Sequence, residues 1–251
     1  MDEQLIAFID LLGFSSIIKA QDDGRQRQIL SLLTSLAEAK GDFSSKTTAF
    51  AAGNPNIEVR PAISAFSDNI VFSVPASGLA ELGAGPLVFM LANFVAGIFS
   101  SAISLGCLVR GGIAFGPLHH GGGVLFGAGL VEAYELESKF AGRPRIVVSE
   151  RASEKLDRHP YLCPDDDGFS CLDYVRAAYD LEVQFKTNRV ETARGWIARI
   201  KRLCEDQIGV LTRAQNGAGL QNWRWFLTRF DHFVATLDPS IVGRSPFVSD
   251  R

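Results

Sequence analysis

The stretch Leu5–Ile18 constrains the fold of this chain most strongly, because it joins a buried strand to a helix through an acid and a glycine. Its first part, Leu5–Ile9, is an uninterrupted apolar run of the length expected of a buried strand. Asp10 follows that run, and the chain then passes Gly13 into a segment, Phe14–Ala20, with the pattern of a helix. The stretch therefore predicts a carboxylate at the end of a buried strand, close to the start of a helix.

A second acid has an equivalent position further along the chain. Asp68 lies in the short Ser-Asp-Asn connection between two strand-like runs, Ile57–Phe66 and Ile70–Val74, which suits a hairpin turn. Mg²⁺ takes oxygen ligands and is commonly held by one or two carboxylates together with substrate phosphates. Asp10 and Asp68 are therefore candidate metal ligands, and the pair predicts a metal-dependent nucleotide site. The alternative is structural: Asp10 would cap the helix that starts at Phe14, and Asp68 would stabilise its turn.

Strand and helix signals alternate along the next part of the chain and predict an α+β domain. From residue 181 on the pattern changes to helix only, with an aromatic-rich stripe at residues 223–233. We expect one α+β domain over residues 1–180 and a helical C-terminal extension over residues 181–251 that packs on it or on a partner subunit. The other predicted helices are Arg25–Ala39, Pro86–Ser104, Ala128–Phe140 and Glu150–Leu156. The other predicted strands are Cys107–Phe115, Arg145–Val148 and a hairpin in Tyr161–Val175. The predicted loops are Lys40–Asn56 and the His119-His120-Gly turn.

Charge and composition argue against several classes of partner. The net charge is −3, so the chain has no global basic field of the kind that nucleic-acid binders carry. The longest apolar stretch, Leu79–Leu105, is interrupted by glycine and polar residues, which favours a core helix over a membrane span. The four cysteines show no Cys-x-x-Cys spacing, and no basic segment precedes the first apolar run. These patterns indicate a cytoplasmic protein that binds neither nucleic acid nor membrane.

The order of the motifs carries a resemblance to a known family. A strand ends in Asp-x-x-Gly-Phe-Ser, and two helices, a strand–Asp–strand hairpin, a long helix, a glycine-rich strand and turn, a helix and a strand follow. Over about residues 4–155 this order resembles the class III nucleotide cyclases, which implies an α+β fold with a ferredoxin-like βαββαβ core. The motifs are most similar to the bacterial pyrimidine cyclases of the Pycsar antiphage system: FIDLLGFS at residues 8–15, FSDNI at 66–70, RGGIAFG at 110–116, EAYELE at 132–137 and NWRWF at 222–226.

The resemblance implies a metal site and a reaction. Asp10 and Asp68 would bridge two divalent ions, Mg²⁺ or Mn²⁺, with the backbone carbonyl of Leu11 as a further ligand. One ion would lower the pKa of the ribose 3′-hydroxyl that attacks the α-phosphorus, and the other would neutralise the triphosphate. Backbone N–H groups before a helix suit the β- and γ-phosphates, and the residues that would offer them are Leu12, Gly13, Phe14 and Ser15. The family builds its sites between two subunits, so a homodimer with two equivalent sites is implied.

Two positions of the family's base pocket differ in this chain. Ser64 stands four positions before Asp68, where purine cyclases usually carry Lys or another hydrogen-bonding residue. Val124 stands three positions before Gly127, where they carry Asp or an equivalent. Ser64 and Phe66 share the strand face of the site, because strand side chains alternate. A Lys–Asp pair reads a purine edge, and Ser64 with Val124 cannot reproduce it, so a smaller pyrimidine base is favoured, without a choice between uracil and cytosine.

The family also places an Asn and an Arg four residues apart on the following helix, to stabilise the pentavalent transition state. The matching positions here are Val131 and Glu135, so another group must offset the developing charge. Arg110, in the Val-Arg-Gly-Gly motif, is our candidate, and ion pairing with an acid is the alternative for it. Arg60 lies roughly 26 Å from Asp68 along an ideal strand, so it would serve only a neighbouring region or a partner's site.

We therefore expect a cytoplasmic lyase that converts UTP, or else CTP, to the 3′,5′-cyclic monophosphate and diphosphate. The resemblance implies that a separate effector protein reads the product in antiviral defence. Two alternatives stay open. One is a purine nucleotide cyclase with a differently built base pocket. The other is a non-catalytic cyclase-like sensor of nucleotides, which the replaced Asn and Arg favour and the retained acids disfavour.

Overall fold

The apolar run near the N-terminus forms β1, Asp2–Leu12, at the centre of a mixed sheet. The computed structural model describes residues 1–38, 61–156, 159–184 and 186–242. β1 pairs antiparallel with β3 (Asn69–Pro75) on one side and with β4 (Leu108–Gly121) on the other. The strand extends beyond the predicted run, so Asp10 lies inside the paired region. The described strands follow the order β2-β3-β1-β4-β6-β8-β7, and β5 pairs with β4.

The first part of the chain has the ferredoxin-like order of elements. In the described residues β1 is followed by α1 and α2, then by the β2–β3 hairpin, α4, α5 and β4, and these strands lie as β2-β3-β1-β4 with antiparallel neighbours. The predicted α+β fold with a βαββαβ core is confirmed. The predicted loop Lys40–Asn56 and the start of the predicted strand Ile57–Phe66 lie outside the described residues. The bounds are α1 Phe14–Lys19, α2 Asp23–Glu38, β2 Ala62–Phe66, α4 Ala76–Leu82 and α5 Ala84–Ser104.

One face of the sheet is covered by α5 and holds the larger apolar core. Alternate side chains of β1 point to this side, as do Phe72 of β3 and Ile63 of β2. α5 is long and apolar enough to cross a membrane by length and composition, but 67% of its apolar window is buried inside the protein. The long apolar stretch is therefore a core helix in this structure, as predicted, and Gly83 separates it from α4.

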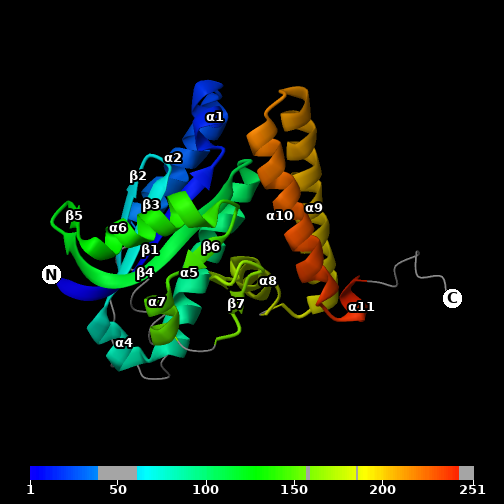
Figure 1. Ribbon diagram of the computed structural model, residues 1–251. Helices are drawn as coiled ribbons and strands as arrows, with labels where there is room; N and C mark the ends of the chain where they lie inside the picture. The colour runs from blue at the N-terminus through cyan, green and yellow to red at the C-terminus, as the bar shows by residue number, and fades with distance from the viewer. Residues whose placement is uncertain (39–60, 157–158, 185, 243–251) are drawn as a thin grey trace.

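The other face carries a smaller core under α6 (Ala128–Glu135), which continues into a π-helical turn, η1 (Leu136–Ala141). Ile6 and Phe8 of β1 point to this side and pack with Val71 of β3 and with Ala133 and Leu136. Figure 1 shows α6 lying across the sheet, with β5 (Val124–Phe126) beyond its beginning. The predicted helix Ala128–Phe140 is thus present, with a wider last turn.

The remaining elements extend the sheet and add helices beside it. β6 (Ile146–Val148) runs parallel to β4, and the predicted hairpin is β7 (Leu162–Pro164) and β8 (Ser170–Leu172). α7 has the predicted bounds, Glu150–Leu156. α9 and α10 form a long antiparallel pair beside the sheet (Figure 1), and Phe226 and Phe230 of α10 are buried in the larger core. The helix bounds are α8 Tyr174–Val183, α9 Arg189–Arg213, α10 Gly217–Ala235 and α11 Pro239–Val242.

One predicted boundary is wrong. We expected the strand at Cys107–Phe115 to end at Gly116-Pro117, with His119 and His120 in a loop, but β4 continues to Gly121. Pro117 is tolerated because β4 pairs there with β1 alone, since β6 reaches only as far as Ile113 and β5 starts opposite His119. The two histidines are therefore strand residues, and the tight turn is made by the glycines that follow them.

Candidate active site

Asp10 lies on the central strand with a polar neighbour on each side. In the sheet register it is opposite Asn69 of β3 and opposite Arg110 of β4. It shares the strand face of Ile6 and Phe8, so its carboxylate points to the α6 side of the sheet. That carboxylate is only 15% exposed. β1 thus carries its acid on the more polar face, close to the end of the strand.

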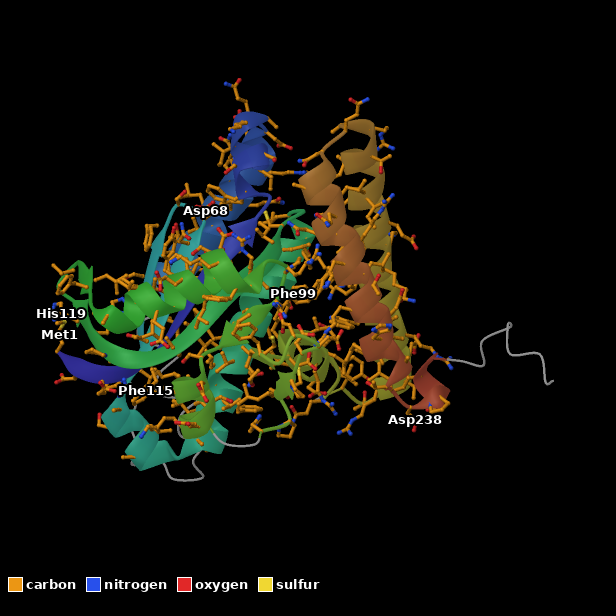
Figure 2. The ribbon with its side chains drawn as sticks, in the orientation of Figure 1. Met1, Asp68, Phe99, Phe115, His119 and Asp238 are labelled. Carbon is orange, nitrogen blue, oxygen red and sulfur yellow. The ribbon has the colours of Figure 1, made fainter. Side chains whose placement is uncertain are left out.

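Asp68 is held beside the end of β1 by a backbone hydrogen bond. The N–H of Leu11 donates to the carbonyl oxygen of Asp68 at 3.0 Å. Ser67 has a φ of 55°, which turns the chain tightly between β2 and β3. The Asn69 side chain donates to the Asp68 carboxylate at 3.1 Å. The two predicted metal ligands are therefore brought to the ends of adjacent strands. Figure 2 shows where Asp68 lies in the molecule.

The structural alternative for Asp10 is wrong. α1 begins after Gly13, which is its N-cap residue, and no side chain caps the helix. Gly13 has a φ of 101°, a backbone conformation that favours glycine, and its carbonyl accepts from the N–H of Ser16 at 3.1 Å. Leu12–Ser15 is thus a tight strand-to-helix turn, as predicted. Its role in holding phosphates stays a prediction, as does the metal-ligand role of the Leu11 carbonyl.

Arg110 is bound by two acids. Its guanidinium donates to Asp10 at 3.3 Å and, through Nε, to Glu137 at 2.5 Å. Glu137 comes from η1 and is 3% exposed, so its charge is compensated mainly by this arginine. The ion-paired alternative for Arg110 is therefore present in the structure, and its role at a transition state stays a prediction. The sequence pattern predicts no role for Glu137, although the EAYELE motif contains it.

Two further acids, Glu137 and Asp68, lie near the Asp10 carboxylate. Burial raises the pKa of its carboxyl group to about 6, and the charges of Glu137 and Asp68 add to this shift, while Arg110 opposes it. A divalent cation would relieve the same repulsion, and carboxylate oxygens are the donors that Mg²⁺ and Mn²⁺ prefer. The donor set therefore fits the implied ions. Among the described residues no cluster of three or more His, Cys, Asp or Glu forms a larger candidate metal centre.

The glycine pair of the Val-Arg-Gly-Gly motif has a packing role. A Cβ at Gly112 would overlap the carbonyl oxygen of Ala133, and one at Gly111 would lie 2.6 Å from the carbonyl oxygen of Phe8. The backbones of β4, β1 and α6 therefore approach more closely than side chains would allow. This close approach is what brings Glu137 beside Arg110. The glycine pair was the available signal in the sequence for such an approach.

The Ser64 hydroxyl has a hydrogen-bonding partner on another strand. Its hydroxyl lies 2.8 Å from Nε2 of His120, and the hydroxyl of Ser73 lies 2.9 Å from Nδ1 of the same ring. Ser73 is fully buried. His120, which we had expected in a solvated loop, therefore ties β4 to β2 and β3 on the α6 side of the sheet.

The other predicted base-pocket residues are both exposed. Phe66 is 49% exposed at the end of β2, and Val124 is 54% exposed on β5. Of the two replaced transition-state positions, Val131 is exposed and Glu135 pairs with Lys139 at 2.5 Å. Neither supplies a cation to the site. Arg60, the weaker candidate cation, lies outside the described residues.

No family model and no curated protein matches the sequence. Among solved structures, one that resembles part of the chain is the monomeric guanylyl cyclase domain of the RhoGC fusion protein from the aquatic fungus Blastocladiella emersonii. Its TM-score is 0.41 at 15% identity, over 68% of this chain and 94% of that chain.

Two more similar structures are a class III adenylyl cyclase-like ATP-binding protein from Pseudomonas aeruginosa and a bacterial light-regulated adenylyl cyclase. Their TM-scores are 0.40 and 0.35, at 12% and 10% identity, over 72% of this chain in both cases. This chain spans 40% and 56% of their respective lengths. Similarities of this extent describe neither activity nor ligands, so the α+β fold is assigned from the strand order of the chain itself.

Proposed function

We propose that this protein is a pyrimidine nucleotide cyclase that converts UTP, or else CTP, to the 3′,5′-cyclic monophosphate and diphosphate. In this reaction the ribose 3′-hydroxyl loses its proton to solvent, and its oxygen forms a bond to the α-phosphorus. The bond from that phosphorus to the bridging oxygen breaks, and diphosphate leaves. The observation that carries the proposal is the meeting of Asp10 and Asp68 at adjacent strand ends, fixed by the hydrogen bond from Leu11 to Asp68.

Asp10, Asp68 and the carbonyl of Leu11 would hold two Mg²⁺ or Mn²⁺ ions. When bound, such ions supply activation of the 3′-hydroxyl and neutralisation of the triphosphate charge. The raised pKa of Asp10 supports this assignment, because burial and then the neighbouring charges of Glu137 and Asp68 disfavour the free carboxylate, and a bound cation would stabilise it.

The residues of the chain would then position the nucleotide. The turn Leu12–Ser15 presents backbone N–H groups at the start of α1, where phosphate oxygens are favoured. Arg110 would offset the negative charge on the α-phosphate oxygens in the transition state, and Glu137 would hold its guanidinium in place. Ser64, Phe66 and Val124 would surround the base. The absence of a Lys–Asp pair at the matching positions supports a pyrimidine.

Exposed apolar side chains on the α6 side of the sheet support a homodimer. Large apolar side chains are exposed on β2, on β5 and along α6 and η1, all elements on the α6 side: Phe66, Val124, Phe126, Val131, Tyr134 and Phe140. A second copy of the chain would cover them, and two equivalent sites would form between the subunits. A role of the product in antiviral defence, read by a separate effector protein, belongs to the same proposal.

The deciding experiment offers the purified full chain each of the four nucleoside triphosphates with Mn²⁺ and identifies the products by mass spectrometry. We expect cyclic UMP, or else cyclic CMP, as the main product, and none from Asp68→Asn. Asp166→Asn, an exposed acid of the β7–β8 turn, is the matched control and should keep the activity. Cyclic AMP or cyclic GMP as the main product would instead identify a purine cyclase. No product from any triphosphate would favour a non-catalytic sensor.

A further inference from the structure

A cavity of about 420 Å³ lies between the C-terminal helix pair and the turn around Gly13. One wall comes from the end of β1, the start of α1 and the α5–β4 connection, and the other comes from α9 and α10. Figure 1 shows the tips of α1 and of the α9–α10 pair at the same end of the molecule. Asp10 and Asp68 do not line this cavity, although Leu12 and Gly13 of the proposed phosphate turn contribute to its wall.

Three carboxamide side chains line the helical wall: Gln207 from α9 and Asn216 and Asn222 at the beginning of α10. The Asn216 oxygen accepts from the N–H of Gly219 at 3.0 Å and so caps α10. Gln207 and Asn222 make no side-chain hydrogen bond with any described residue. Each of these two half-buried side chains therefore has both a donor and an acceptor available to a ligand.

The rest of the lining is apolar or electrically balanced. Asp22 and Arg25 lie at the cavity and pair with each other at 3.6 Å, so their charges compensate. The apolar part of the lining is contributed by Leu12, Ile17, Leu108, Leu211 and Trp223. A site of this kind suits an uncharged ligand with apolar faces and an edge that both donates and accepts hydrogen bonds.

We propose that this cavity binds an uncharged hydrogen-bonding heterocycle of nucleoside size, with its polar edge on Gln207 and Asn222. The carboxamides complement the alternating donors and acceptors of a nucleobase. The charge balance of the lining gives a free nucleoside an advantage over a triphosphate, which would need uncompensated cations.

The cavity lining packs closely against the backbone beside the Gly13 turn. The Gln207 side chain lies against Gly106, where a Cβ would come within 2.7 Å of the amide nitrogen. The carbonyl oxygen of Gly106 in turn lies 3.2 Å from the place a Cβ would occupy on Gly13. A ligand on Gln207 would therefore lie close to the backbone that contacts this turn. An effect on catalysis would rest on the proposed function, whereas binding itself does not.

The test uses the full chain without added metal and the four nucleosides uridine, cytidine, adenosine and guanosine as separate probes. Binding is measured by saturation-transfer NMR and by calorimetry. We expect at least one nucleoside to bind, and Asn222→Leu to weaken it by about tenfold, since one hydrogen-bonding partner is lost. Gln221→Leu is the matched control, because this carboxamide is on the same helix but outside the cavity, and it should leave binding unchanged.

A second variant guards against a folding defect. Ala214→Phe adds volume from an exposed position on the cavity wall and should also weaken binding, with an unchanged circular dichroism spectrum and thermal midpoint. Asp68→Asn should retain binding. The proposal is overturned if no nucleoside binds, if Asn222→Leu and Ala214→Phe bind as well as the parent, or if Asp68→Asn alone abolishes binding. Failure of the triphosphate assay would disprove the cyclase proposal and leave this result intact.

Discussion

The two faces of the central sheet are built in opposite ways. On the α5 side, β1 contributes Leu5, Ala7 and Ile9 to a continuous apolar core that reaches α8 and α10. On the α6 side, the same strand contributes Asp10, which meets Arg110 and the buried Glu137. One face is closed by apolar packing, while the other holds charges and leaves large apolar side chains exposed. Most of the apolar packing that stabilises the fold therefore lies on the α5 side. The α6 side carries the charged residues of the candidate site and the exposed apolar side chains that a second subunit would cover.

The sharpest test of this contrast on the closed side is Phe99→Ala. Phe99 is fully buried on α5 and its ring lies 5.2 Å from that of Tyr174 and 5.5 Å from that of Phe226, so it joins three helices (Figure 2). We expect the free energy of unfolding to fall by about 3–5 kcal/mol, as measured by urea denaturation. A loss below about 1 kcal/mol would show that the α5 side does not dominate stability.

On the α6 side, Asp10→Asn should stabilise the metal-free protein at high pH. The folded-state pKa of Asp10 is raised, so the folded protein binds its proton more tightly, and the free energy of unfolding falls as pH rises from about 4 to about 6. The variant lacks this loss, and its advantage over the parent should grow by about 3 kcal/mol at most between pH 4 and pH 8.

Urea denaturation of both proteins at the two pH values measures this growth. An advantage of the same size at both would contradict the effects of burial and neighbouring charge on Asp10. Added Mn²⁺ should raise the thermal midpoint of the parent and not that of the variant, because only the parent keeps both carboxylates.

Two glycine substitutions contrast a closely packed position under α6 with an exposed position on α5. Gly112→Ala should reduce the free energy of unfolding by roughly 1–3 kcal/mol, because its Cβ would overlap the backbone of Ala133. Gly97→Ala, on α5, meets no atom within 4 Å and should raise stability by about 0.5–1 kcal/mol. Thermal unfolding of the two variants tests both signs, and shifts of equal size and sign would contradict the close approach of α6 to Gly112.

The smallest effect on folding is expected for Phe126→Ala. This side chain is 64% exposed on β5, so its removal should change the free energy of unfolding by less than about 0.5 kcal/mol. If the α6 side is the contact between two copies, the variant should nevertheless dissociate at higher concentration in sedimentation experiments. Unchanged sedimentation of this variant would indicate that Phe126 lies outside any dimer contact.

The order of elements could be predicted from the sequence because it depends on local signals. The segment Glu150–Leu156 is a helix with the predicted bounds, and the Ser-Asp-Asn turn places Asp68 between two strands as predicted. The partners across the sheet could not be predicted in the same way. Glu137 meets Arg110 from 27 residues away, and His120 meets Ser64 from 56 residues away.

Both contacts depend on strand register and on how closely α6 approaches β4, which no single segment encodes. The end of β4 was misplaced for a related reason. Gly116-Pro117 is a local stop signal, and only the pattern of neighbouring strands makes the proline acceptable there.

In the π-helical turn Leu136–Ala141, the number of residues positions the side chains as much as their identity does. Ala133, Glu137 and Ala141 are all buried at intervals of four residues, although an ordinary α-helix would drift by about 40° at each such step. The wider turn cancels that drift and keeps the acid in line with the sheet. A relative that is one residue shorter in this turn would lose the alignment of its Glu137 equivalent with Arg110, even if every other side chain were kept. A one-residue gap in the turn would therefore distinguish chains that lack the Asp10–Arg110–Glu137 arrangement from chains that share it.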